Sequence, residues 1–387
     1  FDRLSATDET CPPLEDYKHL HRQIVQGALP PRFVHLHCGR GLADILKALV
    51  SAFHYALLSG RAIKLANPTM GAAYVSDLDL FSSPFVSGDF SRVPDGQSAV
   101  FQATGFPLPL RLSPYFEGFA RGLNMSSVFG ENHVFISSCL IMPLDCLLND
   151  QISVHAGELR RMGFTAENIF RCSVNFLLRP RPDIFEPHRH LFSDMLGKPE
   201  PARLLGVHLR IGDAAFSSGR FPVARINEFI ARIQEIDGAE RARGSSAVYV
   251  TSDSKLTRDY IRSVLGDAVI INLAATPQHT WLLVRGDEER AEAMRLAVAE
   301  MLILSNADTL VISRGCFGIS SVLLSPRKVA KTYRCMGRPP QWPYAMKKFV
   351  DKVLMNKTML QVGLSCNPFN VTLESLYSPE MKRALPR

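Results

Sequence analysis

The sequence lacks the features of several common protein classes. Its longest apolar region, Leu42 to Leu58, is interrupted by Asp44, Lys47 and His54, which predicts that it does not cross a membrane. No CxxC pair occurs among the eight cysteines, so a zinc site of the usual kind is not expected. No GxxxxGKS or GxxxxGKT phosphate loop occurs either, which argues against kinases and sulfotransferases.

Positive charge is present but not clustered. The 387 residues carry a formal net charge of +7, yet no block rich in Lys and Arg occurs. Evenly spread basic residues are typical of a solvated surface, so we expect no nucleic-acid partner. With 46% hydrophobic and 21% charged residues, the chain has the composition of a globular protein large enough for two domains.

Two features favour the secretory pathway. The cysteine count is even, which permits disulfides. Sequons for N-glycosylation begin at Asn124, Asn356 and Asn370. Because the sequence begins at Phe1 rather than Met, we also expect that an N-terminal signal or membrane anchor has been removed.

The N-terminal part predicts the opening of an α/β domain. Arg32 to Cys38 has the pattern of a strand, Gly39-Arg40-Gly41 that of a turn, and the apolar residues from Leu42 to Leu57 recur at helical spacing. The turn holds two of the three glycines of a dinucleotide fingerprint, and the acidic residue expected after a second strand is missing. An NAD-dependent enzyme is therefore not expected.

A second α/β domain is predicted after the proline-rich residues 179–201, which read as a boundary between domains. Strands and helices alternate beyond it, a pattern typical of a parallel sheet with helices on both faces. The expected strands are Leu204–Leu209, Ala247–Thr251, Ala268–Leu273 and Thr309–Ser313; the expected helices are Val223–Ile236, one ending at Leu265, and Glu288–Leu304.

The first of these strands, in LGVHLRIGD, carries a histidine and an arginine where a buried strand should be apolar. Strand side chains alternate, so His208 and Arg210 share one face and the aliphatic residues around them share the other. An unpaired buried charge is costly, which predicts an anion at the end of this strand. A planar guanidinium such as that of Arg210 suits a diphosphate.

Two further strand ends, TSDS and SRGCFGISS, should meet the first at the same edge of the sheet. Gly315, Gly318, Ser320 and Ser321 lie where a turn enters a helix, and amides and hydroxyls there can bind phosphate. The alternative is a structural ion pair between Arg210 and Asp213, with glycines that only turn the chain.

These segments resemble those of fucosyltransferases that use GDP-fucose. VHLRIGD is similar to the HxRxGD-type motif of the α1,6-fucosyltransferase and protein O-fucosyltransferase groups, and VTSDSKLTRDYI and SRGCFGISSVLLS are similar to later segments of the same enzymes. HCGRGLADILKALVSAFHYALLSGRAI also resembles the start of plant cell-wall, xyloglucan-type fucosyltransferases. The segments from about Gly71 to Asn175 are not placed by the resemblance.

The resemblance implies an α/β, GT-B architecture of two facing Rossmann-like domains. Residues 1–190 would form the acceptor-side domain, residues 191–340 the domain that binds the GDP-sugar, and residues 341–387 a tail packed on the first domain. The enzyme would transfer fucose from GDP-fucose, with inversion and without a metal or other cofactor, to a hydroxyl of a glycan or glycoprotein in the Golgi lumen. The rival from another class is a nucleotide-sugar or carbohydrate-binding protein of the same fold without turnover.

The resemblance also implies roles for individual residues. Arg210 would hold the β-phosphate, His208 would lie beside the nucleotide, and Asp253 would contact the guanine or ribose. Ser320 and Ser321 would cap the diphosphate, although Cys316 and Phe317 interrupt the usual serine cluster. The Gly39-Arg40-Gly41 loop would approach the donor from the other domain.

Two questions about carboxylates remain open. Asp44 follows the glycine loop and is a candidate catalytic base, but an aspartate at a helix start more often stabilises the helix dipole. Asp77 and Asp79 form a DxD motif, which metal-dependent GT-A glycosyltransferases use to hold Mn²⁺ on a nucleotide diphosphate. The alternative for this pair is a loop or capping role near the acceptor.

Overall fold

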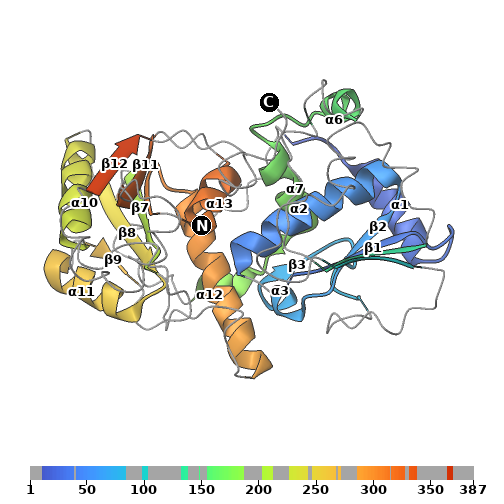
Figure 1. The fold of residues 1–387 in the computed structure, drawn as a ribbon, viewed down its shortest axis with the longest axis horizontal. Helices are drawn as coiled ribbons and strands as arrows, with labels where there is room; N and C mark the ends of the chain where they lie inside the picture. Colours follow the sequence, from blue (N-terminus) through green and yellow to red (C-terminus); the bar gives the residue numbers. More distant parts are fainter. Residues whose placement is uncertain are drawn as a thin grey trace, which may run out of the picture. The chain divides into compact units, whose positions relative to one another are not determined.

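The computed structural model describes residues 11–38, 41–83, 98–102, 132–137, 148, 155–186, 203–211, 226–242, 246–266, 269–271, 286–313, 315–326, 331–337 and 364–368. They divide into two compact units (Figure 1). Unit 1 contains the described residues up to Ile184 and residues 286–298, and unit 2 contains those from Phe185 to 271 and from Ala299 to 368. The first change of unit falls inside the proline-rich segment, while the domain limits expected from the sequence remain predictions.

Unit 1 is built on a parallel sheet in the order β2-β1-β5-β4. Its strands are β1 (Phe33–His37), β2 (Ala62–Leu65), β4 (Ser98–Gln102) and β5 (His133–Ser137). The predicted strand, turn and helix are confirmed, since β1 leads into α2 (Leu42–Ser59), which lies along one face of this sheet (Figure 1).

Helix α2 is the described helix that is long and apolar enough to cross a membrane. Inside unit 1, however, 89% of its length is buried. Val50, Phe53 and Ala56 have no exposed surface, and even Lys47 and His54 are covered. The helix is therefore part of the core, and one ring nitrogen of His54 has a partner within unit 1, since Nε2 lies 3.1 Å from Ser173 Oγ.

The remaining elements of unit 1 surround this layer. A disulfide joins Cys11 to Cys172 in α7, and Cys38 is disulfide-bonded as well. β3 and β6 form an antiparallel pair. The bounds are α1 (Glu15–Val25), α3 (Pro68–Ala73), β3 (Tyr74–Val75), α6 (Ala156–Arg161), α7 (Ile169–Leu177), β6 (Arg179–Pro180) and the 3₁₀ helix η2 (Pro182–Phe185).

Unit 2 is built on a second sheet in the order β12-β11-β10-β7-β8-β9. All neighbouring strands are parallel except β11 and β12. The predicted parallel sheet is therefore confirmed. The strands are β7 (Arg203–Leu209), β8 (Ser246–Ser252), β9 (Val269–Ile270), β10 (Thr309–Ile312), β11 (Lys331–Gly337) and β12 (Leu364–Pro368); the helices are α10 (Ile226–Arg241), α11 (Lys255–Leu265) and α13 (Cys316–Leu324). Helix α12 (Asp287–Ser305) is divided between the units, because its residues from Ala299 onward belong to unit 2.

Strand β7 is central in this sheet and buried on both faces. Leu205, Val207 and Leu209 belong to a core cluster with α10 and α11 residues such as Phe229 and Ile261. The alternate positions face the other side, where a side chain at Gly206 would collide with α12 and β10. The alternation predicted for this strand is thus present, and it directs His208 away from the apolar cluster.

Candidate functional site

The order of strands in unit 2 marks one edge of the sheet as a binding position. From β7 the chain adds β8 and then β9 on one side, and β10 and then β11 on the other. In doubly wound sheets, ligands bind at the carboxyl ends of the strands where the order reverses. Here that position is the end of β7 and β10, followed by Arg210 and by the start of α13.

Arg210 is held at this edge by contacts from both neighbouring strands. Its amide donates to Ser313 Oγ, which follows β10, at 2.6 Å. Its guanidinium donates through Nη1 to Asp253 Oδ2, and Asp253 Oδ1 accepts the Ile211 amide at 2.9 Å. The Arg210 and Asp253 side chains are 12% and 18% exposed, so this ion pair is partly screened from water but still accessible.

His208 is buried in β7, two residues before the arginine, and is neutral at physiological pH. Burial lowers its pKa to about 4; Asp253 acts in the opposite direction, and the cations of Arg210 and Arg258 lower it further. Its ring stacks on that of Phe317, with centroids 4.9 Å apart and planes inclined by 23°. The Nδ1 atom is buried and makes no hydrogen bond within the described part of the chain.

Helix α13 approaches these residues through two glycines. Gly315 has φ +155°, which L side chains rarely adopt, and it turns the chain from β10 into the helix with no side-chain cap. A Cβ atom at Gly318 would lie 2.7 Å from Ile312 Cγ2 and 3.3 Å from His208 Nδ1. The first turn of α13 can therefore pack this closely against the strand ends only because position 318 has no side chain. Amides at a helix N-terminus have no acceptor within the helix and favour anions.

The two serines expected at the diphosphate lie in the second turn of α13. Both are fully buried, and Ser321 Oγ donates to the Phe317 carbonyl at 3.1 Å. Ser320 Oγ makes no hydrogen bond within the described residues. Their contact with phosphate stays a prediction. The N-cap of α13 lies beside Arg210, because a Cβ atom built on Gly315 would be 3.7 Å from Arg210 Cγ.

The predicted meeting of three strand ends is therefore present, with contacts that the sequence did not reveal. Ser313 directly follows β10, and the parallel register of β10 with β7 is what brings its hydroxyl to Arg210. A buried ion pair joins Arg258 of α11 to Glu300 of α12 at 2.8 Å, and Arg258 Nε donates to the Ser252 carbonyl. The basic and acidic residues could be read in the sequence, but their pairing depends on tertiary packing.

The candidate residues of unit 1 are divided between described and undescribed segments. Gly39 and Arg40 lie outside the described residues, as does Asp213 of the alternative ion pair. Gly41 is the N-cap of α2. Asp44 lies in the first turn and forms an ion pair with Lys47 at 2.6 Å, which is the arrangement of a dipole-stabilising residue. Its role as a base stays a prediction.

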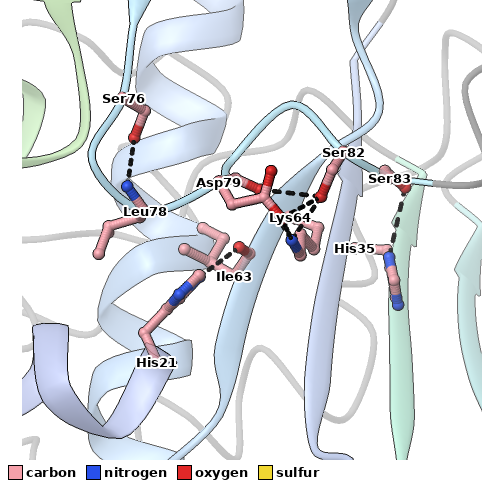
Figure 2. Close-up of polar contacts among 9 residues, drawn as sticks. All are labelled: His21, His35, Ile63, Lys64, Ser76, Leu78, Asp79, Ser82 and Ser83. Atoms are coloured by element: carbon pink, nitrogen blue, oxygen red, sulfur yellow. Dashed lines mark hydrogen bonds and ion pairs between the residues drawn. The ribbon is translucent and has the colours of Figure 1, made fainter. Parts of the chain in front are cut away.

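The DxD carboxylates are both paired with cationic side chains. Asp77 binds Arg179 and lies 3.6 Å from Lys18. Asp79, with φ +48°, accepts from Lys64 Nζ through its carboxylate and its carbonyl, each at 2.8 Å (Figure 2). No group of three or more His, Cys, Asp or Glu side chains that could hold a metal occurs in the described part of the chain.

The neighbouring histidines complete a polar layer on the sheet of unit 1. His35 Nε2 lies 3.2 Å from His133 Nδ1. On the other side of the ring, Ser83 Oγ lies 3.4 Å from His35 Nδ1 (Figure 2). Burial, followed by the charges of His133 and Lys64, lowers the pKa of His35 to about 3. Lys64 Nζ also donates to Ser82 Oγ at 2.6 Å, so its three protons all have acceptors. This layer is satisfied internally.

Asp79→Asn should destabilise the protein more than Asp77→Asn. Lys64 is 6% exposed at its side chain and would lose its counter-ion, which costs about 1.5–3 kcal/mol for a hydrogen bond to a charged group. Asp77 pairs on the surface, where an ion pair contributes below about 1 kcal/mol. Asn tolerates the left-handed backbone of Asp79, so the change isolates the charge.

Urea denaturation of the two variants measures the difference, and melting with and without Mn²⁺ tests metal binding. Equal stability losses, or a rise in melting temperature with Mn²⁺ that either substitution removes, would contradict the ion-pair role.

The fold resembles that of a solved plant protein, FUT1 of Arabidopsis thaliana. Neither a protein-family model nor a curated protein matches this sequence. Among solved structures, an arginine-to-lysine mutant of Arabidopsis thaliana FUT1 in complex with GDP superposes with a TM-score of 0.57 at 14% identity, over 88% of this chain and 92% of that one.

Two more structures cover less of this chain. NodZ α1,6-fucosyltransferase from Bradyrhizobium, crystallised with GDP, has a TM-score of 0.46 at 16% identity over 79% of this chain and 95% of its own. POFUT1 with GDP-fucose has a TM-score of 0.39 at 15% identity over 78% and 95%. The likeness to the plant enzyme shows that the chain has an α/β fold of the same kind as Arabidopsis FUT1.

Proposed function

We propose that the protein is an inverting GT-B glycosyltransferase that transfers fucose from GDP-fucose to a hydroxyl of a glycan or protein. The two units would be the facing Rossmann-like domains of this architecture. The proposal is carried by the position of Arg210 beside the N-terminus of α13, at the point where the strand order of unit 2 reverses. The fold shared with a plant fucosyltransferase that was solved with GDP supports the choice of donor.

The site offers what a departing nucleoside diphosphate requires. In the proposed reaction, the acceptor oxygen bonds to C1 of fucose as the bond from C1 to the phosphate oxygen breaks, and the electron pair of that bond passes to GDP. Negative charge grows on the diphosphate, where a guanidinium and helix amides stabilise it without a metal. The acceptor proton passes to a base, for which Asp44 is the candidate in unit 1.

The nucleotide would lie along the strand ends. His208 is neutral and stacked on Phe317, so it would position the nucleotide rather than neutralise its charge. The Gly39-Arg40-Gly41 loop is proposed to approach the donor from unit 1. Ser320 and Ser321 are proposed to support the diphosphate from the second turn of α13.

Two alternatives make different demands. A metal-dependent GT-A enzyme would need Asp77 and Asp79 for Mn²⁺, but both carboxylates are occupied by Lys or Arg side chains. A binding protein of the same fold would take up GDP-fucose without breaking it. Hydrolysis of GDP-fucose would distinguish an enzyme from such a binding protein.

The compartment is proposed to be the Golgi lumen. The disulfide between Cys11 and Cys172 supports an oxidising environment, because such bonds are rare in the cytosol. The acceptor would accordingly be a glycan or glycoprotein of the secretory pathway.

GDP should raise the melting temperature with the logarithm of its concentration, because a ligand that binds only the folded state stabilises it; 100 times Kd adds about 2.7 kcal/mol. GDP-fucose should act similarly and should release GDP slowly without an acceptor. Differential scanning fluorimetry and a GDP-release assay measure both effects. Stabilisation by UDP that requires Mn²⁺ would contradict the donor assignment, and binding of GDP-fucose without any release would favour the binding protein.

Arg210→Ala should reduce turnover by a factor on the order of 10² to 10³, or about 3–4 kcal/mol, because it removes a preorganised charged donor at the leaving group. Arg210→Lys should restore little, since a point charge cannot replace the planar fork. Arg241→Ala, which removes an exposed arginine paired with Asp237, is the matched control. Normal turnover with a lower melting temperature in Arg210→Ala would assign the residue to structure alone.

A further inference from the structure

We propose that Asp253 is a positioning residue for Arg210, fixing one amino group of the guanidinium so that its other donors remain available to the donor diphosphate. This inference rests on the proposed function. It also differs from the role that the sequence resemblance implies, in which Asp253 contacts the guanine or ribose. The two roles predict different effects of the same substitutions.

The placement of Asp253 follows from the register of β7 and β8. Leu209 pairs with Ser252, so the residues after the two strands, Arg210 and Asp253, lie opposite one another. Asp253 Oδ2 accepts from Arg210 Nη1 at 2.5 Å and Asp253 Oδ1 accepts from the Ile211 amide at 2.9 Å. One carboxylate therefore fixes both the side chain and the following peptide at the end of β7.

The ion pair uses only part of the guanidinium. Arginine has five N–H donors in a planar fork, and a single one, on Nη1, is directed to Asp253. Within the described residues, Asp253 is the acceptor for this guanidinium. Anchoring one donor restricts the rotation of the guanidinium and leaves its other donors for phosphate oxygens. A purely structural ion pair would not need to leave donors available.

Asp253 itself is held from both sides, so the carboxylate is a fixed point. The carbonyl before it, on Ser252, accepts from Arg258 Nε at 2.7 Å. Arg258 in turn forms an ion pair with Glu300 at 2.8 Å, and their side chains are 2% and 8% exposed. The residue after it, Ser254, caps α11 by accepting the Thr257 amide. A carboxylate on so constrained a backbone is suited to aligning Arg210 rather than to leaving when an anion binds.

A fixed carboxylate beside Arg210 reduces the positive potential that the bound diphosphate experiences. Its removal should therefore not weaken GDP binding in the ground state, whereas the loss of alignment should slow bond breaking. We expect Asp253→Asn to lower kcat for GDP-fucose by a factor of roughly 10 to 100 and to change KM by less than about threefold. Asp253→Glu keeps the charge and should recover part of kcat.

The matched control is Asp259→Asn. Asp259 lies on α11 and pairs with Lys255 at the surface, with side chains 44% and 52% exposed, so its substitution should leave kcat and KM unchanged. Far-ultraviolet circular dichroism and melting curves confirm that each variant is folded. If Asp253→Asn does not fold, Asp253→Glu provides the comparison. Its carboxylate is intact but displaced by one methylene, so kcat should still fall while KM changes little.

The double variant Arg210→Ala/Asp253→Asn decides between the two roles. If Asp253 acts through Arg210, the second substitution should add no further loss to either GDP affinity or kcat, since the effects of substitutions at two residues in contact are not additive. A further loss of GDP affinity in the Arg210→Ala background would instead assign Asp253 to the nucleoside, and the inference would be wrong.

The outcomes separate this inference from the proposed function. Wild-type protein that neither binds GDP nor hydrolyses GDP-fucose overturns the proposed function and the inference with it. Wild-type turnover together with unchanged kcat in Asp253→Asn overturns the inference alone. Tighter GDP binding with full kcat would show that Asp253 competes with phosphate instead of positioning Arg210.

Discussion

The parallel pairing of β7 with β10 is the constraint on which the candidate site depends. Their register places Ile312 beside His208, which allows the Ser313 hydroxyl to accept the Arg210 amide. It also brings the turn at Gly315 and the first turn of α13 to the end of β7. A slip of one residue would direct Arg210 toward the apolar cluster and turn Val207 away from it, so the packing of the core and the position of the charge fix one another.

Two groups of buried polar side chains, one in each unit, differ in how fully their donors and acceptors are paired. In unit 1, Lys64 has an acceptor for each of its three protons, and His35 contacts both His133 and Ser83. In unit 2, His208 Nδ1 is buried without a hydrogen bond within the described residues, and the guanidinium of Arg210 is only partly used. Buried polar groups are normally paired, so a concentration of incompletely used donors and acceptors at one sheet edge indicates a ligand. The polar layer of unit 1 is explained by its own contacts.

Much of this arrangement follows from local sequence patterns. The alternation in LGVHLRIGD correctly separates His208 from the aliphatic face of β7, and the glycines of SRGCFGISS mark the turn into α13. Patterns cannot show which carboxylate meets a given arginine, because that depends on strand order and register. Among the described residues, Arg210 pairs with Asp253, which is 43 residues away in sequence, and the contact between Arg258 and Glu300 arises only when α11 and α12 pack. The DxD motif is an example in which the local pattern suggests a metal site, while the structure pairs the two carboxylates with Lys64 and Arg179. A motif of three residues cannot show which cations lie beside it in the fold.

The GT-B proposal joins these features into one physical account. An anion site at a reversal of strand order needs a preorganised cation, helix amides and a backbone that can approach closely, and unit 2 supplies them through Arg210, α13 and Gly318. A crystal structure of the protein grown with GDP tests this account most directly. The account predicts the β-phosphate in contact with the Arg210 guanidinium and with amides of the first turn of α13, while Asp253 stays bonded to Arg210. GDP bound elsewhere, with Arg210 bonded to Asp253 alone, would contradict it.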